Sequence, residues 1–301
     1  MAAFRSVAII GLGLIGSSIA RAVRERMPDV RICGYDVSAE CRQIAQKMEI
    51  CDDYAASAAD AVVIAELIIL CVPVGQMATV GAAIAPNLAP GAVVSDVGSS
   101  KADVLAALTA ALPGVTVIPA HPVAGTENSG PAAGFASLFD GRWCILTPPA
   151  DADGDKVSAL ADFWTALGAR VEHMDAAHHD LVLAVTSHLP HLIAYTIVGT
   201  ASDLEGVTRS EVIKYSAGGF RDFTRIAASD PVMWRDVFLN NRDAVLEMLQ
   251  RFSEDLSQLQ RAIRVGDGQI LEDWFTRTRA IRRSIIAEGQ DDPAPDFGRK
   301  H

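Results

Sequence analysis

Short apolar runs recur through the first half of the chain, and stretches with helical spacing separate them. The runs predict buried strands at residues 7–10, 31–35, 67–72, 92–96, 116–120, 143–147 and 170–174. Helices fill the gaps, and residues 100–111 and 155–167 form the clearest of them. Strands that alternate with helices predict an α/β fold with a doubly wound parallel sheet that ends near residue 174.

The second half of the chain has helical periodicity and contains no convincing strand. Residues 175–201 predict one helix that is kinked at Pro190. Asp230 and Pro231 have the order of an N-cap and a first helical residue, and they predict a long helix that runs to about Val265. Its apolar spacing predicts a buried stripe formed by Phe238, Val245, Leu249, Phe252, Leu256, Leu259 and Ile263. Gly266 and Gly268 end this helix, and a last helix follows them.

These patterns predict a nucleotide-binding domain at residues 1–174, an all-helical domain at 175–288 and a loose polar tail at 289–301. The helical domain is too elongated to bury all its apolar faces alone. Packing against a second copy would cover them, so we expect a homodimer. The alternative is that the helices fold back onto their own nucleotide-binding domain.

A glycine-rich segment, Gly11-Leu12-Gly13-Leu14-Ile15-Gly16, lies between the first strand and the first helix, as a dinucleotide fingerprint requires. Gly11 allows a tight turn, Gly13 lets the backbone meet a pyrophosphate, and Gly16 lets the helix pack on the strand. Leu14 and Ile15 complete this cofactor-binding segment at the helix N-terminus.

Asp36 ends the second strand, 20 positions after Gly16, where an acid accepts hydrogen bonds from the adenosine ribose. Its carboxylate would repel a 2′-phosphate, and residues 37–39 supply no arginine to bind one. The sequence therefore predicts NAD rather than NADP as the cofactor.

Composition narrows the class of protein. The net charge of −11, from 26 basic and 37 acidic residues, argues against a nucleic-acid partner. An anionic substrate would need a few well-placed cations. No apolar run is expected to span a membrane, no signal-peptide pattern is seen, and the five cysteines form no C-x-x-C pair. We therefore expect a cytoplasmic protein with reduced thiols and no membrane partner.

Two clusters follow strands of the nucleotide-binding domain. Ser99, in Asp96-Val97-Gly98-Ser99-Ser100-Lys101, is expected to bind the substrate hydroxyl or to orient a catalytic group. The alternative role for Ser99 is to cap the next helix, and Lys101 is expected to face solvent. His121 begins His121-Pro122-Val123-Ala124-Gly125-Thr126-Glu127 at the carboxyl end of a strand. It is the candidate general base, with a pKa near the usual value of about 6.5, and a buried core histidine is the alternative.

Two further clusters lie in the helical half. His188 and His191 are three residues apart on one helix face. They could bind a metal together with His178, His179 or Asp180, but hydride transfer to NAD needs none, so we expect one of them to bind a substrate carboxylate. After Gly218-Gly219, the guanidinium groups of Arg221, Arg225 and Arg235 have the fork geometry that grips carboxylates, although some of them are expected to be solvated.

With these clusters in this order, residues 7 to about 264 resemble the prephenate and arogenate dehydrogenases of tyrosine biosynthesis. The resemblance rests on G-L-G-L-I-G-S-S, D-V-G-S-S-K, H-P-V-A-G-T-E, S-H-L-P-H and G-G-F-R-D-F-T-R-I-A-x-S-D-P-x-M-W-R-D. It implies an N-terminal Rossmann domain, a helical dimerisation domain and NAD-dependent oxidative decarboxylation of a small anionic cyclohexadienyl substrate. It also implies that Ser99 and His121 are catalytic and that His191 and Arg225 bind substrate. Thr126, Gly218 and Trp234 would line its pocket.

Other functions stay open. A β-hydroxyacid or imine-type NAD dehydrogenase would need a catalytic lysine in the helical half, where Lys214 is the only lysine between residues 157 and 299. A nucleotide-sensing regulator on the same fold would need neither His121 nor three arginines. The sequence does not decide between prephenate and arogenate.

Overall fold

The structure is a computed structural model that describes residues 4–126, 128–203 and 218–287. Lys214 and Glu127 lie outside the described residues. The chain forms two compact units, Met1–Val245 and Leu246–His301.

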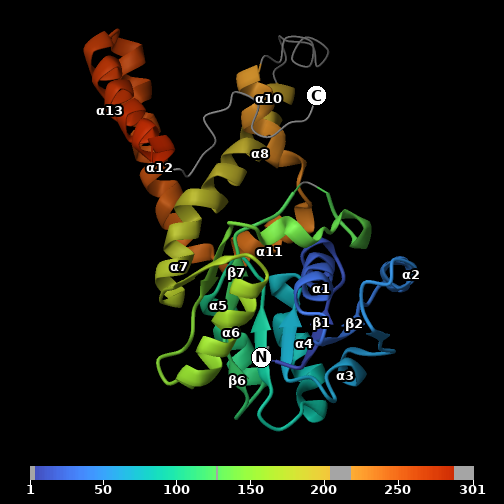
Figure 1. The fold of residues 1–301 in the computed structure, drawn as a ribbon. Coiled ribbons are helices and arrows are strands. Elements are labelled where there is room, and N and C mark those ends of the chain that lie inside the picture. Colours follow the sequence, from blue (N-terminus) through green and yellow to red (C-terminus); the bar gives the residue numbers. More distant parts are fainter. Residues whose placement is uncertain (1–3, 127, 204–217, 288–301) are drawn as a thin grey trace. The chain divides into compact units, whose positions relative to one another are not determined.

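The first unit contains a six-stranded sheet in the order β3-β2-β1-β4-β5-β6 (Figure 1). Its strands are β1 (Ser6–Ile10), β2 (Arg31–Tyr35), β3 (Asp53–Tyr54), β4 (Leu67–Leu70), β5 (Val93–Asp96) and β6 (Thr116–Val117). All neighbouring strands pair in parallel. The predicted parallel sheet is therefore confirmed, and its strand order reverses between β1 and β4, the point where such sheets bind ligands.

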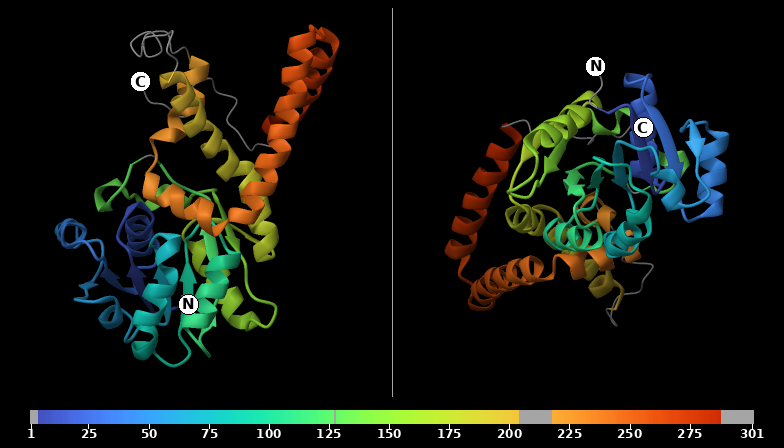
Figure 2. Two further views of the ribbon diagram at one scale, coloured as in Figure 1. Left: turned by 180° about the vertical axis from the view of Figure 1, so that it is seen from behind. Right: turned by 90° about the horizontal axis from the view of Figure 1, so that it is seen from below.

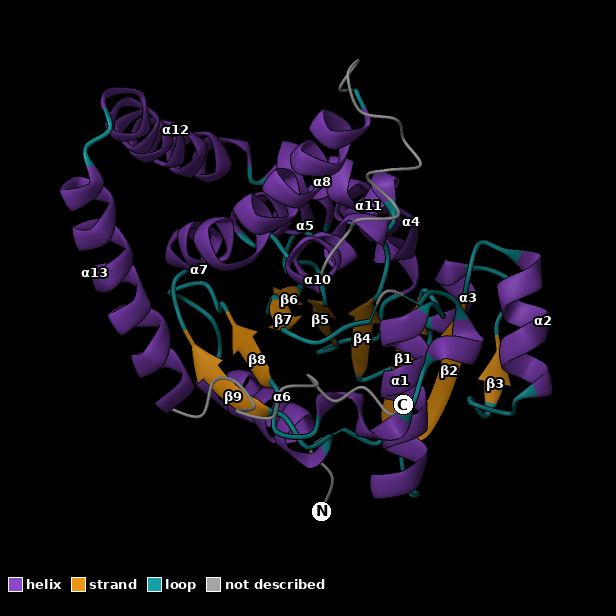
Figure 3. Ribbon diagram, turned by 90° about the horizontal axis from the view of Figure 1, so that it is seen from above, coloured by secondary structure: helices purple, strands orange, loops and turns teal. Residues whose placement is uncertain are grey.

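Helices cover both faces of this sheet (Figure 3). They are α1 (Leu14–Arg26), α2 (Ala39–Lys47), α3 (Ala58–Ala61), α4 (Met77–Ile84), α5 (Ala102–Ala111) and α6 (Gly154–Ala166). Val7 and Ile9 of β1 pack in the cluster that includes residues of α1 and α6, whereas Ala8 and Ile10 pack with residues of α4 and α5. This alternation explains why β1 is apolar throughout, because both of its faces are buried.

Three strands form a second sheet, which the sequence did not separate from the first. They are β7 (Ala120–Pro122), β8 (Trp143–Leu146) and β9 (Arg170–His173), with β7 antiparallel and β9 parallel to β8. The strand predicted at residues 116–120 thus divides into β6 and β7, and His121 lies within β7 rather than after a strand. Pro119 and Pro122 have no N–H to donate, so the segment does not continue one uniform ladder.

One long helix begins the helical half. It comprises α7 (Ala176–Leu183), a π turn (Ala184–His188) and α8 (Leu189–Ser202), and Asp175 caps its first turn. The π turn lies just before Pro190, where the prediction placed a kink. At 27 residues, this helix is long and apolar enough to cross a membrane by length and composition, so the expectation that no run meets that test was wrong. Its polar residues His179, Asp180 and His188 are instead buried in the first unit.

The next helices are α10 (Gly218–Thr224), followed by the 3₁₀ turn Arg225–Ala228, and α11 (Pro231–Asn240). Asp230 caps α11 by accepting a 2.7 Å hydrogen bond from the Met233 N–H, as predicted. The predicted continuous helix breaks at Asn241, whose backbone leaves the helical region (φ −114°, ψ 35°), and α12 (Arg242–Val265) begins after it.

α12 and α13 (Gly268–Ala287) are joined at Gly266, whose φ is +74°, so the predicted glycine break is confirmed (Figure 2). The predicted stripe along α12 is buried only in part. Val245 is buried, whereas Leu256 and Ile263 are 54% and 67% exposed. A single chain therefore leaves apolar surface uncovered on this helix.

Candidate active site

The loop after β1 has the backbone that dinucleotide binding requires. Gly11 has φ +101°, and a Cβ there would lie 2.3 Å from the carbonyl oxygen of Cys71. A Cβ at Gly16 would lie 1.9 Å from the carbonyl oxygen of Gly11, so only glycine fits at both positions. A Cβ at Gly13 would meet nothing within 4 Å, so the backbone there is open to a ligand. These residues fit a bound pyrophosphate.

The rest of the predicted cofactor site surrounds this loop. Leu14 and Ile15 open α1, whose first turn contains no acidic residue and therefore suits a phosphate. Asp36 follows β2, and its Oδ2 accepts a 2.8 Å hydrogen bond from the Leu12 N–H. Its Oδ1 accepts a 2.8 Å hydrogen bond from the Ser38 N–H. The carboxylate is thus held at the loop by two backbone groups.

An arginine lies beside Asp36, although residues 37–39 contain none. Arg42 of α2 donates from Nη1 to the carbonyl oxygens of Asp36 and Val37. Its guanidinium carbon is 5.6 Å from the ring centroid of Tyr35. The first turn of α2 brings this side chain back to the end of β2, a placement that the sequence of residues 37–39 does not reveal.

His121 is the first member of a hydrogen-bonded chain of three side chains. Its Nδ1 lies 2.9 Å from Nε2 of His179, and Nδ1 of His179 lies 2.8 Å from Oδ1 of Asp180. His121 is 8% exposed and His179 is fully buried. Sequence reasoning considered His179 and Asp180 only as metal ligands, because nothing in their spacing shows that α7 places them against β7.

Burial also changes the acidity of these histidines. Removal from water and the neighbouring imidazole of His179 hold the pKa of His121 well below its usual 6.5. Burial likewise lowers the pKa of His179. The pKa of His121 therefore lies below the ordinary value expected for it, and both imidazoles are neutral at physiological pH.

Lys101 was predicted to face solvent, and this prediction is wrong. Its side chain and that of Asp96 are fully buried, and its Nζ donates to Oδ2 of Asp96. It also donates to the carbonyl oxygen of Ala120, 2.7 Å away. The carboxylate of Asp180 accepts the backbone N–H groups of Lys101 and Ala102, at 2.7 and 2.9 Å. α5 accordingly begins at Ala102 and is capped by a carboxylate from α7, so the alternative role of Ser99 as the cap of this helix is wrong.

The two serines of the loop after β5 differ in exposure. Ser99 is half-buried, and its backbone interacts with the imidazole of His188. Ser100 is fully buried, and within the described residues its Oγ has no hydrogen-bond partner. The loop after β5 thus contacts the π turn through the backbone of Ser99.

A second group of side chains continues from His188 toward α11. His188 is fully buried, its Nδ1 is 3.0 Å from Nδ2 of Asn241, and burial lowers its pKa to about 4. His191 stacks on Trp234, with ring centroids 3.7 Å apart and planes at 25°. The Nδ1 of His191 is 2.8 Å from the Ser187 carbonyl oxygen. Because that oxygen only accepts, Nδ1 carries the proton and Nε2 is left for a ligand.

Arg225 is close enough to His191 for its charge to act on that imidazole. Burial is the largest cause of the lowered pKa of His191, and the positive charge of Arg225 adds to it. The structure therefore brings together His191, Trp234 and Arg225, three of the predicted substrate residues. Thr126 and Gly218 are exposed, and the described hydrogen bonds and ring contacts link neither to this group.

The metal alternative does not match this arrangement. His188 and His191 have separate partners, and His179 and Asp180 bond to each other. Within the described ranges, no group of three or more His, Cys, Asp or Glu side chains is placed to hold a metal ion.

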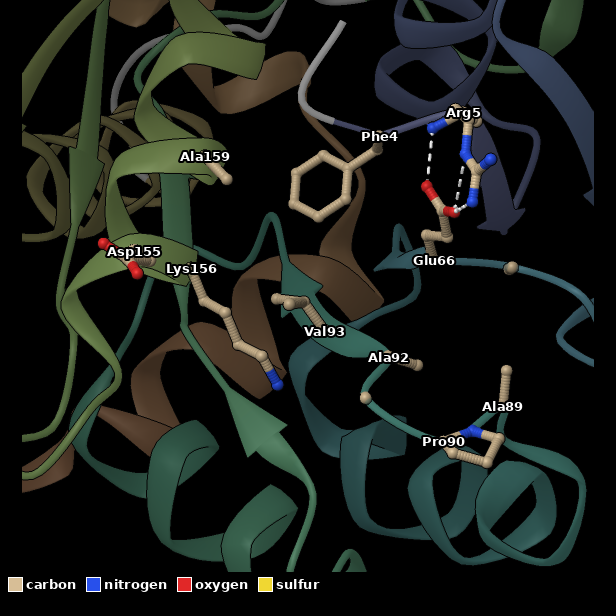
Figure 4. A pocket seen from close by; sticks show the side chains of 12 residues that line it. Phe4, Arg5, Glu66, Ala89, Pro90, Ala92, Val93, Asp155, Lys156 and Ala159 are labelled. Carbon is tan, nitrogen blue, oxygen red and sulfur yellow. Dashed lines mark hydrogen bonds and ion pairs between the residues drawn. The ribbon is translucent and has the colours of Figure 1, made fainter.

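A cavity of about 540 Å³ lies at the amino-terminal ends of the strands of the six-stranded sheet (Figure 4). The cofactor loop follows the carboxyl end of β1, at the other edge of this sheet. Phe4, Glu66 and Val93 line the cavity, and Lys156 points toward it from α6. None of the predicted site residues contributes to it, so this cavity is separate from the candidate active site.

The two halves of the chain match two family models. Residues 19–173 match the nucleotide-binding domain of prephenate dehydrogenase, and residues 175–277 match its dimerization domain. Among curated proteins, the chain is 45% identical to a cyclohexadienyl dehydrogenase of Zymomonas mobilis, over 95% of this chain and 97% of the relative. It is 33% identical to a prephenate dehydrogenase of Bacillus subtilis, over 93% of this chain and 76% of the relative.

Solved structures are similar as well. Prephenate dehydrogenase from Aquifex aeolicus, in complex with hydroxyphenyl propionate and NAD⁺, superposes with a TM-score of 0.86 at 32% identity, over 93% of this chain and 98% of that one. Arogenate dehydrogenase from Synechocystis has a TM-score of 0.78 at 25% identity, over 93% of this chain and 99% of that one.

Proposed function

This chain belongs to the prephenate dehydrogenase family, and we propose that it catalyses the NAD-dependent oxidative decarboxylation of prephenate, arogenate or both. The products would be 4-hydroxyphenylpyruvate from prephenate and tyrosine from arogenate. The named relatives include a cyclohexadienyl, a prephenate and an arogenate dehydrogenase, so they support the reaction without selecting one substrate.

The observation that carries this proposal is the His121–His179–Asp180 chain. A carboxylate oxygen can only accept a hydrogen bond, so Nδ1 of His179 carries a proton and donates it in a hydrogen bond to Asp180. Neutral His179 then has a lone pair on Nε2, which accepts a hydrogen bond from the Nδ1–H of His121. Neutral His121 consequently keeps its own lone pair on Nε2. These two hydrogen bonds thus select the tautomer of His121 that a general base needs, with the proton on Nδ1 and the lone pair on Nε2.

The reaction follows from that tautomer. Bound NAD supplies the two-electron acceptor. Nε2 of His121 takes the proton of the hydroxyl on ring C4 as the C4–H bond breaks and the C4–O double bond forms. The C4 hydrogen leaves with its bonding electrons for that acceptor. The bond to the ring carboxylate then breaks and releases carbon dioxide, and its electrons complete the aromatic ring while the C4 oxygen returns to a single bond and takes the proton back from His121. Ser99, in the loop after β5, is the proposed partner that orients the hydroxyl toward His121.

Substrate binding is assigned to the second group. Arg225 grips a carboxylate with its guanidinium fork, and the Trp234 ring lines the pocket behind His191. His191 binds a carboxylate only after it takes up a proton, because its Nδ1 already donates to Ser187. Thr126 and Gly218 are assigned to the pocket wall by family motif.

The same reasoning assigns NAD rather than NADP. Asp36 presents a carboxylate at the end of β2 and would repel a 2′-phosphate. Arg42 stands close enough to bind such a phosphate, but its guanidinium is held by two backbone carbonyls. The solved relative from Aquifex aeolicus contains NAD⁺, which agrees with this assignment.

We assign a homodimer in the cytoplasm. The dimerization-domain match covers residues 175–277, and exposed apolar side chains such as Leu256, Ile263 and Phe275 lie within it. The five cysteines are free thiols, as expected in a reducing compartment.

Steady-state assays with purified protein test this function. Prephenate and arogenate are each offered with NAD and with NADP, while the reduced nicotinamide and the released carbon dioxide are measured together. We expect NAD reduction with at least one substrate and one carbon dioxide per nicotinamide. No reduction with either substrate, or reduction without decarboxylation, would refute the proposal.

A further inference from the structure

Lys101 and Asp96 are two charged side chains with no contact with water, and the proposed mechanism does not use them. Both are 0% exposed. A buried ion pair recovers its cost of desolvation poorly, and apolar residues of the same size often stabilise a protein as well. Stability alone therefore gives a weak reason for this pair, and its position suggests another.

The pair bridges the two sheets at the residue that precedes His121. Asp96 is the last residue of β5 in the six-stranded sheet, and Ala120 is the first residue of β7 in the three-stranded sheet. Lys101 Nζ bonds to the carboxylate of Asp96 and to the Ala120 carbonyl oxygen. Oδ2 of Asp96 also accepts the Gly98 N–H at 2.7 Å. The peptide group that leads into His121 is thereby tied to the end of β5.

Lys101 also helps to hold the side chains that contact the imidazole of His121. Its backbone N–H bonds to Oδ1 of Asp180, the same oxygen that lies 2.8 Å from Nδ1 of His179. His179 in turn contacts the His121 ring. One residue therefore fixes both the backbone before His121 and the side chains that set its tautomer.

We propose that Lys101, paired with Asp96, is a positioning residue for His121 that clamps its backbone and places a positive charge near its imidazole. This inference rests on the proposed function, because it assigns a role in the action of the base.

The charge has a consequence for pH dependence. The groups whose charge acts on the His121 imidazole are His179 from α7, Lys101 beside β5 and His188 from the π turn. Cys144 of β8 interacts with the backbone of His121 and not with its ring. Burial lowers the pKa of His121 most, then His179, and the Lys101 charge lowers it further. Removing that charge allows the imidazole to hold its proton to higher pH. The base would then become active only at higher pH.

The test uses Asp96→Asn/Lys101→Met, which removes both charges together and leaves no buried ion unpaired. Arg26→Met/Asp140→Asn is the matched control, because Arg26 also bonds to a carboxylate and to a backbone carbonyl, that of Leu167. Melting temperature, kcat, KM and the pH profile of kcat are measured for both variants and the unmodified enzyme.

We expect the Asp96/Lys101 variant to fold and to lose about 10-fold to 100-fold in kcat, the range for misplaced catalytic groups. Its KM should change little, and its acidic limb should move to higher pH. The control should keep the kcat and the pH profile of the unmodified enzyme. A folded variant with unchanged kcat and an unchanged acidic limb overturns the inference.

Asp96→Asn alone covers the case in which the double variant does not fold. Lys101 then sheds its proton to avoid an unpaired buried charge, while the neutral amine still donates to the Ala120 carbonyl. This variant should shift the acidic limb upward with a smaller loss of kcat, and an unmoved limb overturns the role of the charge. If the unmodified enzyme oxidises neither substrate, the proposed function fails first, and this inference falls with it.

Discussion

Replacement of His179 by phenylalanine should disable the base without touching the substrate. The phenyl ring fills the space of the imidazole but offers no acceptor to Nδ1 of His121 and no donor to Asp180. Asp180 keeps its two backbone partners, Lys101 and Ala102, so the cap of α5 survives. The damage is thus confined to the orientation and tautomer of His121.

The magnitude follows from the lost acceptor. A buried N–H without a partner costs about 1–3 kcal/mol, and His121 avoids that cost by moving its proton to Nε2. That tautomer has no lone pair facing the substrate. Loss of a general base costs on the order of 10²–10⁴ in rate. We therefore expect kcat to fall by about 10²-fold to 10³-fold, or roughly 3–4 kcal/mol at ~1.4 kcal/mol per decade, while KM changes little.

His178→Phe is the matched control, because His178 is the exposed neighbour of His179 on the same helix. Steady-state NAD reduction gives kcat and KM, and circular dichroism confirms that each variant is folded. The double variant His121→Asn/His179→Phe should be little slower than His121→Asn, since both changes disable one base. A folded His179→Phe enzyme with kcat within about threefold of the unmodified value would refute the idea that the hydrogen bonds from His121 through His179 to Asp180 prepare His121 as the base.

Other outcomes follow from the same site. His121→Asn should lower kcat by a factor of about 10²–10⁴ and abolish the acidic limb of the pH profile. In the unmodified enzyme this limb lies below pH 6.5, because burial lowers the pKa of His121 and activity rises as His121 loses its proton. An acidic limb that persists in the variant would belong to another group. Arg225→Ala should raise the substrate KM by roughly one to three orders of magnitude with NAD affinity unchanged, and Arg221→Ala should do less; an equal loss of NAD affinity would mean that the site has been disrupted. Asp36→Ser should increase the efficiency with NADP relative to NAD about tenfold or more, because a like-charge repulsion is removed; an unmodified enzyme that already uses both equally would contradict the role of Asp36. Light scattering should give twice the chain mass of 31.9 kDa, and a monomer at micromolar concentration would contradict the dimer.

Local patterns in the sequence determined the elements and the cofactor loop. The turn at Gly11, the close packing at Gly16 and the carboxylate of Asp36 depend on residues near one another in the chain, and their spacing follows from the geometry of one strand, one turn and one helix. The N-cap at Asp230 and the break at Gly266 are local in the same sense. The sequence also selected His121 as a candidate base, although it placed this residue after a strand of the parallel sheet, whereas His121 lies within β7 of the second sheet.

The tertiary structure alone decided which side chains surround His121. His179 is 58 positions away in the chain, and only the packing of α7 against β7 brings its Nε2 within 2.9 Å of the imidazole. Lys101 follows a strand and has the polarity of a surface residue, yet it is buried because Asp96, Ala120 and Asp180 supply partners that no local pattern reveals. Propensity and periodicity describe contacts within a few residues, whereas burial, acidity and tautomer depend on distant elements that meet only in the folded chain.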